Sequence, residues 1–260
     1  MENDYIVVID SGIGGLSTLA KCINSSKMNY YYVADNKNIP YGSHTAEEIQ
    51  TYLAEIIINL KKKCDFKIVI LACNTATTTS IEHLRNRFKD LIFIGTEPAI
   101  KLAYDHSYKN ILAVTTPATA KQNKFRSLKN SLPCNIKVLC LASLASNIEH
   151  YISTKSYLSY AKLLKDIMKI VVISQGFDCI VLGCTHYVFL KQYLKKHINV
   201  SLIDGNDGVK KQLSRIMKQL NKTNNDKFCI KFSNTLSQHA TNQIYKKILG
   251  QILANAENLW

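Results

Sequence analysis

Short apolar runs rich in β-branched residues alternate along the chain with longer stretches in which apolar residues recur at helical spacing. This alternation is typical of parallel strands joined by helices. It predicts two sets of four strands, first over Tyr5–Ile9, Tyr30–Ala34, Lys67–Ala72 and Ile92–Gly95, and then over Asn110–Val114, Ile136–Cys140, Cys179–Gly183 and Val200–Ile203. Helices are expected over Gly14–Asn24, Thr45–Lys63, Thr77–Lys89, a segment after Thr119, Leu158–Gln175 and Tyr187–His197.

The two sets of strands are followed by similar residues. The third strand of each set ends in a cysteine that precedes small polar residues, Cys73 in the first set and Cys184 in the second. The fourth ends near a carboxylate, Glu97 or Asp204. The offsets are nearly constant, because 184 − 73 is 111 and 204 − 97 is 107. Two similar units related by pseudo-symmetry are therefore expected.

The predicted fold class is α/β, with two pseudo-symmetric domains that each contain a mainly parallel sheet flanked by helices. The residues after Asp204 are mostly helix-like through Trp260 and have no counterpart after the first set. We expect them to return to the first domain, which would comprise residues 1–97 and 208–260, with the second domain at 98–207. Open α/β sheets bind ligands at the carboxyl ends of their strands. Facing domains would point both cysteine turns into one cleft, which is the predicted active site.

Composition supports a globular protein. The 260 residues are 47% hydrophobic and 20% charged, which excludes a disordered, collagen-like or coiled-coil chain. No apolar run approaches the roughly 18–20 residues that a membrane span requires, so no membrane association is expected. The N-terminal residues are acidic where a targeting signal would be basic, which predicts a cytoplasmic location.

The chain is strongly basic. It has 33 lysines and arginines against 19 acidic residues, a formal net charge of +14, and its arginines are limited to Arg85, Arg87, Arg126 and Arg215. Specific recognition of phosphates and guanines favours arginine, whereas lysine is a flexible point charge. A lysine-rich solvated surface is therefore expected, with nonspecific attraction to nucleic acid as the alternative and no specific nucleic-acid partner.

Eight cysteines are scattered along the chain without a C-x-x-C pair. Most free cysteines are small buried hydrophobic residues. Cys73 and Cys184 differ, because each is expected at the end of a strand and just before a helix. The positive end of a helix dipole favours a thiolate there, and the backbone amides of the same turn can bind a carboxylate.

Two thiols on opposite sides of a small ligand suit proton abstraction from one face of a carbon and redelivery to the other. The α-proton of an amino acid is weakly acidic, so both the base and the developing carbanion need electrostatic help. Asp10 and His186 could tune the two thiols, one on each side. Asn74, Thr75 and Thr185 supply neutral donors for a substrate.

Each of these residues has an alternative interpretation. A strand-end cysteine or a lone histidine can be purely structural. Cys184 and His186 could bind a metal, but the sequence does not place the further ligands this requires. The segment Asp10-Ser11-Gly12-Ile13-Gly14-Gly15 resembles a phosphate loop, yet it lacks both the G-x-G-x-x-G spacing and the Walker lysine.

Taken together, these motifs resemble the cofactor-independent glutamate racemases of the aspartate/glutamate racemase superfamily. The opening motif is similar to residues 10–17, and a second motif to Asp35 with Pro40-Tyr41-Gly42. The remaining motifs are similar to Cys73-Asn74-Thr75-Ala76, Glu97-Pro98-Ala99 and Gly183-Cys184-Thr185-His186-Tyr187. Aspartate racemases usually carry a glutamate where His186 stands, so the histidine favours glutamate.

The resemblance implies that Cys73 and Cys184 transfer the proton, each in one direction, with Asp10 and His186 assisting. It implies a substrate site made of Asp10, Ser11, Tyr41, Gly42, Asn74, Thr75, Thr185 and His186. Asp35, Glu97, Thr119 and Glu149 are further candidates. No cofactor and no metal is implied. The substrate would be glutamate, the D-glutamate product would supply peptidoglycan synthesis, and the protein would be a cytoplasmic homodimer.

The sequence also departs from the family pattern. A Cys-Pro segment with a glutamate usually follows the sixth strand, whereas residues 139–150 lack the proline and Glu149 matches only approximately. Two rival hypotheses remain. The first is a racemase or isomerase for aspartate, a hydantoin or maleate. The second is a basic binding protein on a degenerate racemase scaffold, which a missing catalytic residue would indicate.

Overall fold

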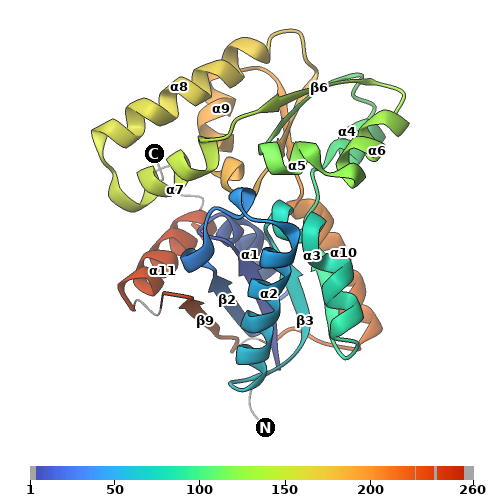
Figure 1. Ribbon diagram of the computed structural model, residues 1–260, viewed down its shortest axis with the longest axis vertical. Coiled ribbons are helices and arrows are strands. Elements are labelled where there is room, and N and C mark those ends of the chain that lie inside the picture. The colour runs from blue at the N-terminus through green and yellow to red at the C-terminus, as the bar shows by residue number, and fades with distance from the viewer. Residues whose placement is uncertain (1–3, 226, 237–238, 255–260) are drawn as a thin grey trace. The chain divides into compact units, whose positions relative to one another are not determined.

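Two parallel sheets, each flanked by helices, organise the chain (Figure 1). The computed structural model describes residues 4–225, 227–236 and 239–254. They divide into two units: unit 1 takes the described residues of Met1–Thr96 and Asn206–Ala256, and unit 2 contains Glu97–Gly205. The predicted fold class is therefore confirmed. Among the described residues, no helix is long and apolar enough to cross a membrane.

The sheet of unit 1 has five parallel strands in the order β4-β3-β1-β2-β9. The central strand β1 has side chains buried on both faces of the sheet, and Val7 and Val8 are fully inaccessible. Its continuous apolar sequence reflects this burial, since helices cover both faces. The strands are β1 (Asp4–Asp10), β2 (Tyr30–Ala34), β3 (Asp65–Leu71), β4 (Ile92–Gly95) and β9 (Ile230–Asn234).

Five α-helices and two 3-10 helices belong to unit 1 in the part of the chain that the structure describes. Helix α2 starts with a capping box, in which Thr45 accepts from the Glu48 amide and the Glu48 carboxylate accepts from the Thr45 amide. The helices are α1 (Gly15–Ile23), η1 (Asn36–Asn38), η2 (Tyr41–Ser43), α2 (Ala46–Lys61), α3 (Asn74–Arg87), α10 (Asn206–Gln219) and α11 (His239–Leu253).

Buried polar contacts attach the segment after Asp204 to unit 1. The Thr18 hydroxyl donates to the Asn206 side-chain oxygen at 2.7 Å, and the Asn206 amide donates to Ser17 Oγ at 3.3 Å. Lys21 and Asp207 form an ion pair at 2.7 Å between the same two helices. These bonds join the start of α10 to α1.

The strand β9 corrects the prediction that the segment after Asp204 is helical. Residues 230–234 pair in parallel with β2, from Tyr30 with Ile230 to Ala34 with Asn234. The sequence Ile230-Lys231-Phe232-Ser233 alternates apolar and polar residues, which is the strand period. Five residues between two helical stretches are too short for that period to stand out. Residues 255–260 of the predicted helical segment lie outside the described residues.

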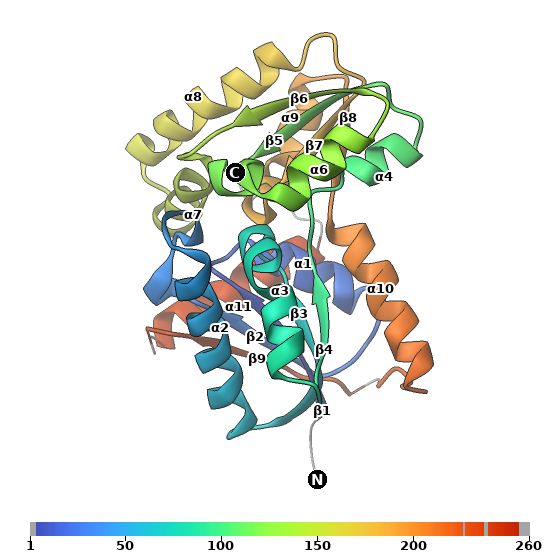
Figure 2. The same ribbon diagram turned by 45° about the vertical axis from the view of Figure 1, so that its right-hand side comes forward.

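The sheet of unit 2 has four parallel strands in the order β6-β5-β7-β8 (Figure 2). They are β5 (Asn110–Thr115), β6 (Asn135–Cys140), β7 (Cys179–Gly183) and β8 (Ser201–Asp204). The flanking helices are α4 (Ile100–Asp105), α5 (Pro117–Lys121), α6 (Asn123–Ser131), α7 (Leu144–Thr154), α8 (Tyr157–Ile173), η3 (Thr185–Leu190) and α9 (Lys191–His197). All eight predicted strands are present, whereas α4 and α7 were not predicted.

Two helix starts differ from the prediction, and both follow a candidate cysteine. Helix α3 begins at Asn74 instead of Thr77, so Asn74 and Thr75 lie in its first turn. The segment expected as a helix from Tyr187 is a 3-10 helix that begins at Thr185, followed by α9. Polar residues at a helix start carry little apolar periodicity, so the sequence pattern locates the following turns better than the first one.

Backbone segments approach each other closely where β1 turns into α1. A Cβ atom added at Gly15 would lie 2.6 Å from Asp10 Cβ, 3.0 Å from Ala72 Cβ and 3.0 Å from Tyr32 Oη. The Tyr32 hydroxyl donates to the Gly12 carbonyl at 2.6 Å in the same turn. The turn after β1 can therefore pack against β2 and β3 only with glycine at position 15.

We predict that Gly15→Ala lowers the free energy of unfolding by about 1–3 kcal/mol, because its methyl group overpacks this turn. The same substitution at Gly208 in α10 or Gly250 in α11 meets no atom within 4 Å. These control variants should gain about 0.5–1 kcal/mol from the better helix propensity of alanine. Urea unfolding measures all three. Equal effects at positions 15 and 208 would contradict the packing argument.

Candidate functional site

Polar residues of unit 1 gather at the carboxyl edge of its sheet. Strands β1 and β3 are neighbours, and the Ala72 amide donates to the Ile9 carbonyl at 2.9 Å. Asp10, which ends β1, is 1% exposed, and its Oδ1 accepts from the Gly12 amide at 3.0 Å. The parallel arrangement thus brings Asp10 and the residues that follow β3 to one edge of the sheet.

Cys73 occupies the N-cap position of the 14-residue helix α3. The Ser11 hydroxyl donates to its Sγ at 4.0 Å, which links the turn after β1 to the turn after β3. Asn74 and Thr75 follow in the first helical turn and are buried. The first amides of a helix have no partner within the helix, and they lie at its positive end. Cys73, Asn74 and Thr75 therefore surround a position suited to an anionic group.

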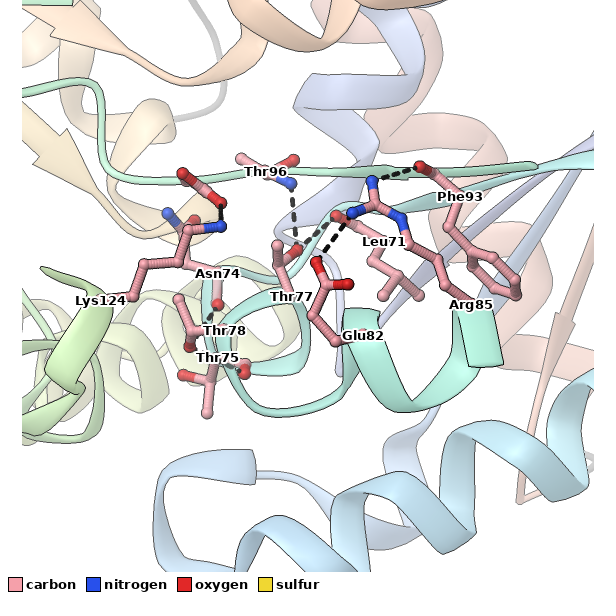
Figure 3. Close-up of polar contacts among 11 residues, drawn as sticks. Leu71, Asn74, Thr75, Thr77, Thr78, Glu82, Arg85, Phe93, Thr96 and Lys124 are labelled. Atoms are coloured by element: carbon pink, nitrogen blue, oxygen red, sulfur yellow. Dashed lines mark hydrogen bonds and ion pairs between the residues drawn. The ribbon is translucent and has the colours of Figure 1, made fainter. Parts of the chain in front are cut away.

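Thr77 holds the first turn of α3 in place. Its hydroxyl donates to the Leu71 carbonyl at 3.1 Å and accepts from the Thr96 amide at 3.0 Å (Figure 3). About two turns further along, Arg85 donates to the Phe93 carbonyl at 3.1 Å and pairs with Glu82 (Figure 3). These bonds tie α3 to β3 and β4, so the position of Cys73 is set by the sheet.

Asp35 is fully buried just after β2 and serves as a hydrogen-bond centre. Its carboxylate accepts from Tyr41 Oη at 2.7 Å, from Thr235 Oγ1 at 2.7 Å and from the side-chain amide of Asn38 at 3.0 Å. Burial, followed by the negative charge of Asp35, raises the pKa of Tyr41 well above its usual value. Tyr41 has thus committed its only proton to Asp35, while the neighbouring Gly42 is exposed in η2.

In unit 2, Cys184, His186 and Glu149 form a chain of contacts. Cys184 precedes η3, and its Sγ lies 3.8 Å from His186 Nδ1. His186 Nε2 lies 2.6 Å from Glu149 Oε2, and the side chain of His186 is 4% exposed against 18% for Glu149. Because η3 is a short 3-10 helix, its dipole is weaker than that of α3. The imidazole ring provides the local polar group instead.

The surroundings of His186 raise its pKa, which favours the protonated ring. Burial by itself would lower the pKa of His186, because it penalises the charged ring. The hydrogen bonds with Cys184 and Glu149, together with electrostatic attraction from these two groups, outweigh burial, and the pKa lies well above its usual value. Both ring nitrogens are donors in this form, so Nδ1 can donate to a thiolate while Nε2 donates to the carboxylate.

A second buried carboxylate fixes the helix that carries Glu149. Asp166 on α8 accepts from Ser143 Oγ and the Asn147 amide, both at 3.0 Å, at the start of α7. The Tyr187 hydroxyl donates to the Leu141 carbonyl at 3.1 Å, which joins η3 to the same segment. Sequence reasoning missed Asn147 and Asp166, because α7 was not predicted. Asp166 could have been found, because the helical period of α8 assigns its position to the core, where a carboxylate needs partners.

The remaining candidates are held by other groups. Glu97 forms an ion pair with Lys124, and Asp204 forms one with Lys191 at 2.5 Å, so the two carboxylates that end corresponding strands each pair with a lysine. Thr119 is fully buried at the start of α5, where its backbone amide donates to Thr116 Oγ1 and its own Oγ1 accepts from the Thr116 hydroxyl. Thr185 is 3% exposed at the start of η3. No cluster of three metal-ligating side chains occurs among the described residues.

A family model described as Asp/Glu/Hydantoin racemase matches residues 9–211, most of the chain. The solved glutamate racemase of Escherichia coli superimposes with a TM-score of 0.82, covering 96% of this chain and 95% of that one at 23% identity. It therefore shares the fold. The class defined by these matches is that of the amino-acid racemases, which are isomerases.

Relatives at higher identity narrow the class. The glutamate racemase of Clostridium botulinum is 37% identical over 231 residues, covering 86% of this chain and 88% of the relative. The glutamate racemase of Leptospira interrogans is 36% identical over 213 residues, covering 80% of each chain. The chain belongs to the Asp/Glu/hydantoin racemase family, and within it to the glutamate racemases. The resemblance expected from the sequence motifs is confirmed.

We predict that Glu149→Gln destabilises unit 2 more at pH 6 than at pH 9. The pKa of His186 is higher in the folded protein than in the unfolded chain, where it is about 6.5. The protonated ring therefore stabilises the fold fully below about pH 6.5, and this stabilisation is lost as the pH rises through the folded-state pKa. Glutamine keeps an acceptor for His186 but removes the charge, at a cost of about 1.5–3 kcal/mol where the ring is protonated. Urea unfolding at both pH values measures the difference.

The matched control is Glu82→Gln, which removes an exposed carboxylate paired with Arg85 and away from any histidine. Its effect should be small and equal at the two pH values. A Glu149→Gln cost that is independent of pH would contradict the protonated His186. The NMR titration of the His186 ring should also move to lower pH in this variant.

Proposed function

We propose that the protein interconverts L- and D-glutamate with Cys73 and Cys184 as the two proton-transfer groups. In each direction one cysteine, as thiolate, takes the α-proton of the substrate, and the other, as thiol, gives a proton to the opposite face of the carbon. The thiol that loses its proton is then the thiolate of the reverse reaction. The observation that carries this proposal is a cysteine at the carboxyl end of the corresponding strand in each unit, β3 and β7.

The two cysteines would be assisted differently. His186, protonated and held by Glu149, can donate to the Cys184 sulfur and offset negative charge there. Cys73 has no histidine in the equivalent position, and the N-terminus of α3 with the Ser11 hydroxyl supplies the polar environment instead. Asp10 is proposed to assist on the Cys73 side, because it ends the strand next to β3 and is buried. Glu149 would then be the carboxylate that supports the Cys184 side.

The residues that would bind the substrate are proposed from the family resemblance. We assign the carboxylates of glutamate to amides and hydroxyls at Ser11, Gly42, Asn74, Thr75 and Thr185, since these lie at helix starts and turns. Tyr41 would bind the substrate through its backbone, because its hydroxyl already donates to Asp35. Asp35 would be a positioning residue rather than a ligand for the substrate.

Relatives support glutamate as the substrate. The curated relatives at 36–37% identity are glutamate racemases, and the E. coli structure contains L-glutamate. D-glutamate made by this chain would supply peptidoglycan synthesis. A cytoplasmic homodimer is proposed on the family resemblance alone, and sedimentation velocity measures the oligomeric state.

We predict that Cys73→Ala and Cys184→Ala each lower kcat/KM for both glutamate enantiomers by at least about 10²–10⁴-fold, because a missing proton-transfer group is not replaced by the other. Circular dichroism of the amino acid measures racemisation directly. Full racemisation by either single variant would rule out the two-thiol mechanism.

Cys64→Ser in unit 1 and Cys134→Ser in unit 2 are the matched controls. Both thiols are half-buried and lie outside the candidate site. They should keep nearly full activity. The rival aspartate hypothesis makes a different prediction, in which aspartate and not glutamate loses its optical activity with the unmodified protein. No change with either amino acid would favour the degenerate binding scaffold.

A further inference from the structure

Helix α8 carries large apolar side chains on its solvent side. Tyr157 is 82% exposed, Leu158 75%, Val172 60% and Met168 52%, and they include the most exposed large hydrophobic residues described in the chain. The opposite side of the same helix is buried through Leu163, Ile167 and Ile170. The helix lies along the outer border of unit 2 in both views (Figures 1 and 2). The buried side of α8 packs against the rest of unit 2. This packing does not account for the apolar residues on its exposed side.

The exposed apolar residues form one stripe. At about 100° per residue, Tyr157, Ala161, Met168 and Val172 fall within an arc of about 60°, with Leu158 about 40° beyond it. The stripe runs from the first turn to the last, about 22 Å at 1.5 Å per residue. Single exposed apolar side chains are ordinary, whereas a continuous stripe of this length marks an interaction surface.

The polar residues next to the stripe are lysines. Lys162, Lys165 and Lys169 are exposed. At about 100° per residue, Lys165 falls between Val172 and Leu158, and the other two lie just beyond Leu158. The acidic residue of α8, Asp166, is 4% exposed and turned toward Ser143, Asn147 and Lys169. The outward side of α8 thus combines apolar side chains with lysines, of which Lys169 pairs with the buried Asp166 at 3.1 Å.

We propose that α8 docks the protein on an anionic lipid surface, lying parallel to the plane of the membrane. An amphipathic helix with aromatic and aliphatic residues on one side and lysines beside them binds at the headgroup boundary. Lysine stems extend along the apolar layer and place their charge among the headgroup phosphates. The helix has 17 residues and three exposed lysines, so it lies on the bilayer and does not span it.

The charge distribution distinguishes this partner from two others. A second copy packed antiparallel through the same stripe would bring the lysines of both copies to the same side, where they repel. An acidic protein partner is normally recognised by arginine, which pairs with carboxylates in a fixed geometry. The four arginines of the chain all lie outside α8. Diffuse attraction by lysine matches a lipid surface of negative charge.

The experiment is co-sedimentation of the full chain with phosphatidylcholine vesicles that contain or lack phosphatidylglycerol. We expect binding to the anionic vesicles, little binding to the neutral ones, and weaker binding as salt is raised. The double variant Lys162→Gln/Lys165→Gln should bind about 25-fold more weakly, at about fivefold for each lysine near the surface. Leu158→Ser/Met168→Gln should lose binding by a similar or larger factor.

Matched controls separate α8 from the general charge of the chain. Lys210→Gln/Lys211→Gln on α10 removes the same charge from an exposed helix of unit 1, and Ile58→Gln removes an exposed apolar side chain from α2. Both should retain binding. Far-UV circular dichroism and thermal unfolding show that each variant is folded. As a further readout, the fluorescence of Leu158→Trp should shift to the blue on anionic vesicles.

Three outcomes would overturn the proposal. Equal losses in the α8 and α10 lysine variants would assign the binding to net charge. Absence of binding to anionic vesicles at low salt would exclude the lipid surface. A dimer that Leu158→Ser/Met168→Gln converts to a monomer, together with no vesicle binding, would assign the stripe to a second copy of the chain.

Discussion

The parallel direction of all strands is the constraint on which the candidate chemistry depends. A parallel sheet collects the carboxyl ends of its strands at one edge, and the helices that follow begin there. In unit 1 this edge brings Asp10, Asp35 and Cys73 together from three strands, although they are far apart in sequence. In unit 2 the same rule places Thr115, at the end of β5, next to Gly183, which ends β7 just before Cys184. Antiparallel pairing of one strand would send its polar end to the opposite edge.

Burial of these polar ends requires that they bond with one another. Asp35, Asp166 and the His186–Glu149 pair are each surrounded by partners within 3.1 Å. An unpaired carboxylate at such a position would carry a large desolvation penalty, so each network constrains the segments that supply its partners. The hydrogen bond to Asp35 positions Tyr41. The bonds of Asp166 to Ser143 and Asn147 fix the start of α7, and so position Glu149 on that helix. The positions of the residues that would contact a substrate are thus set by buried residues that do not contact it themselves.

The sequence predicted the strands well because each is a short apolar run between polar turns, and Cys73 and Cys184 because they stand at corresponding turns. Elements whose formation depends on contacts with distant parts of the chain were predicted less well. Helix α7 has apolar residues at Leu144, Ile148 and Ile152, but its start is recognisable only with Asp166 beside it. Strand β9 needs β2 to complete its pairing. The partner of His186 was left open, because Glu149 fits the family pattern only approximately and its distance to the ring comes from the packing of α7.

The pairing of β2 with β9 has a consequence for how the chain reaches its folded state. Tyr30 pairs with Ile230, and Thr235 bonds with Asp35, so both contacts close a loop of 200 residues that contains the whole of unit 2. During synthesis, unit 2 has all of its strands before β9 leaves the ribosome. Unit 1 must wait with an open sheet edge, and Asp35 without its bond from Thr235, until the last part of the chain arrives. Contacts of such long sequence separation fold slowly. The inserted unit therefore completes first, and the order of assembly is the reverse of the order in which the two units begin.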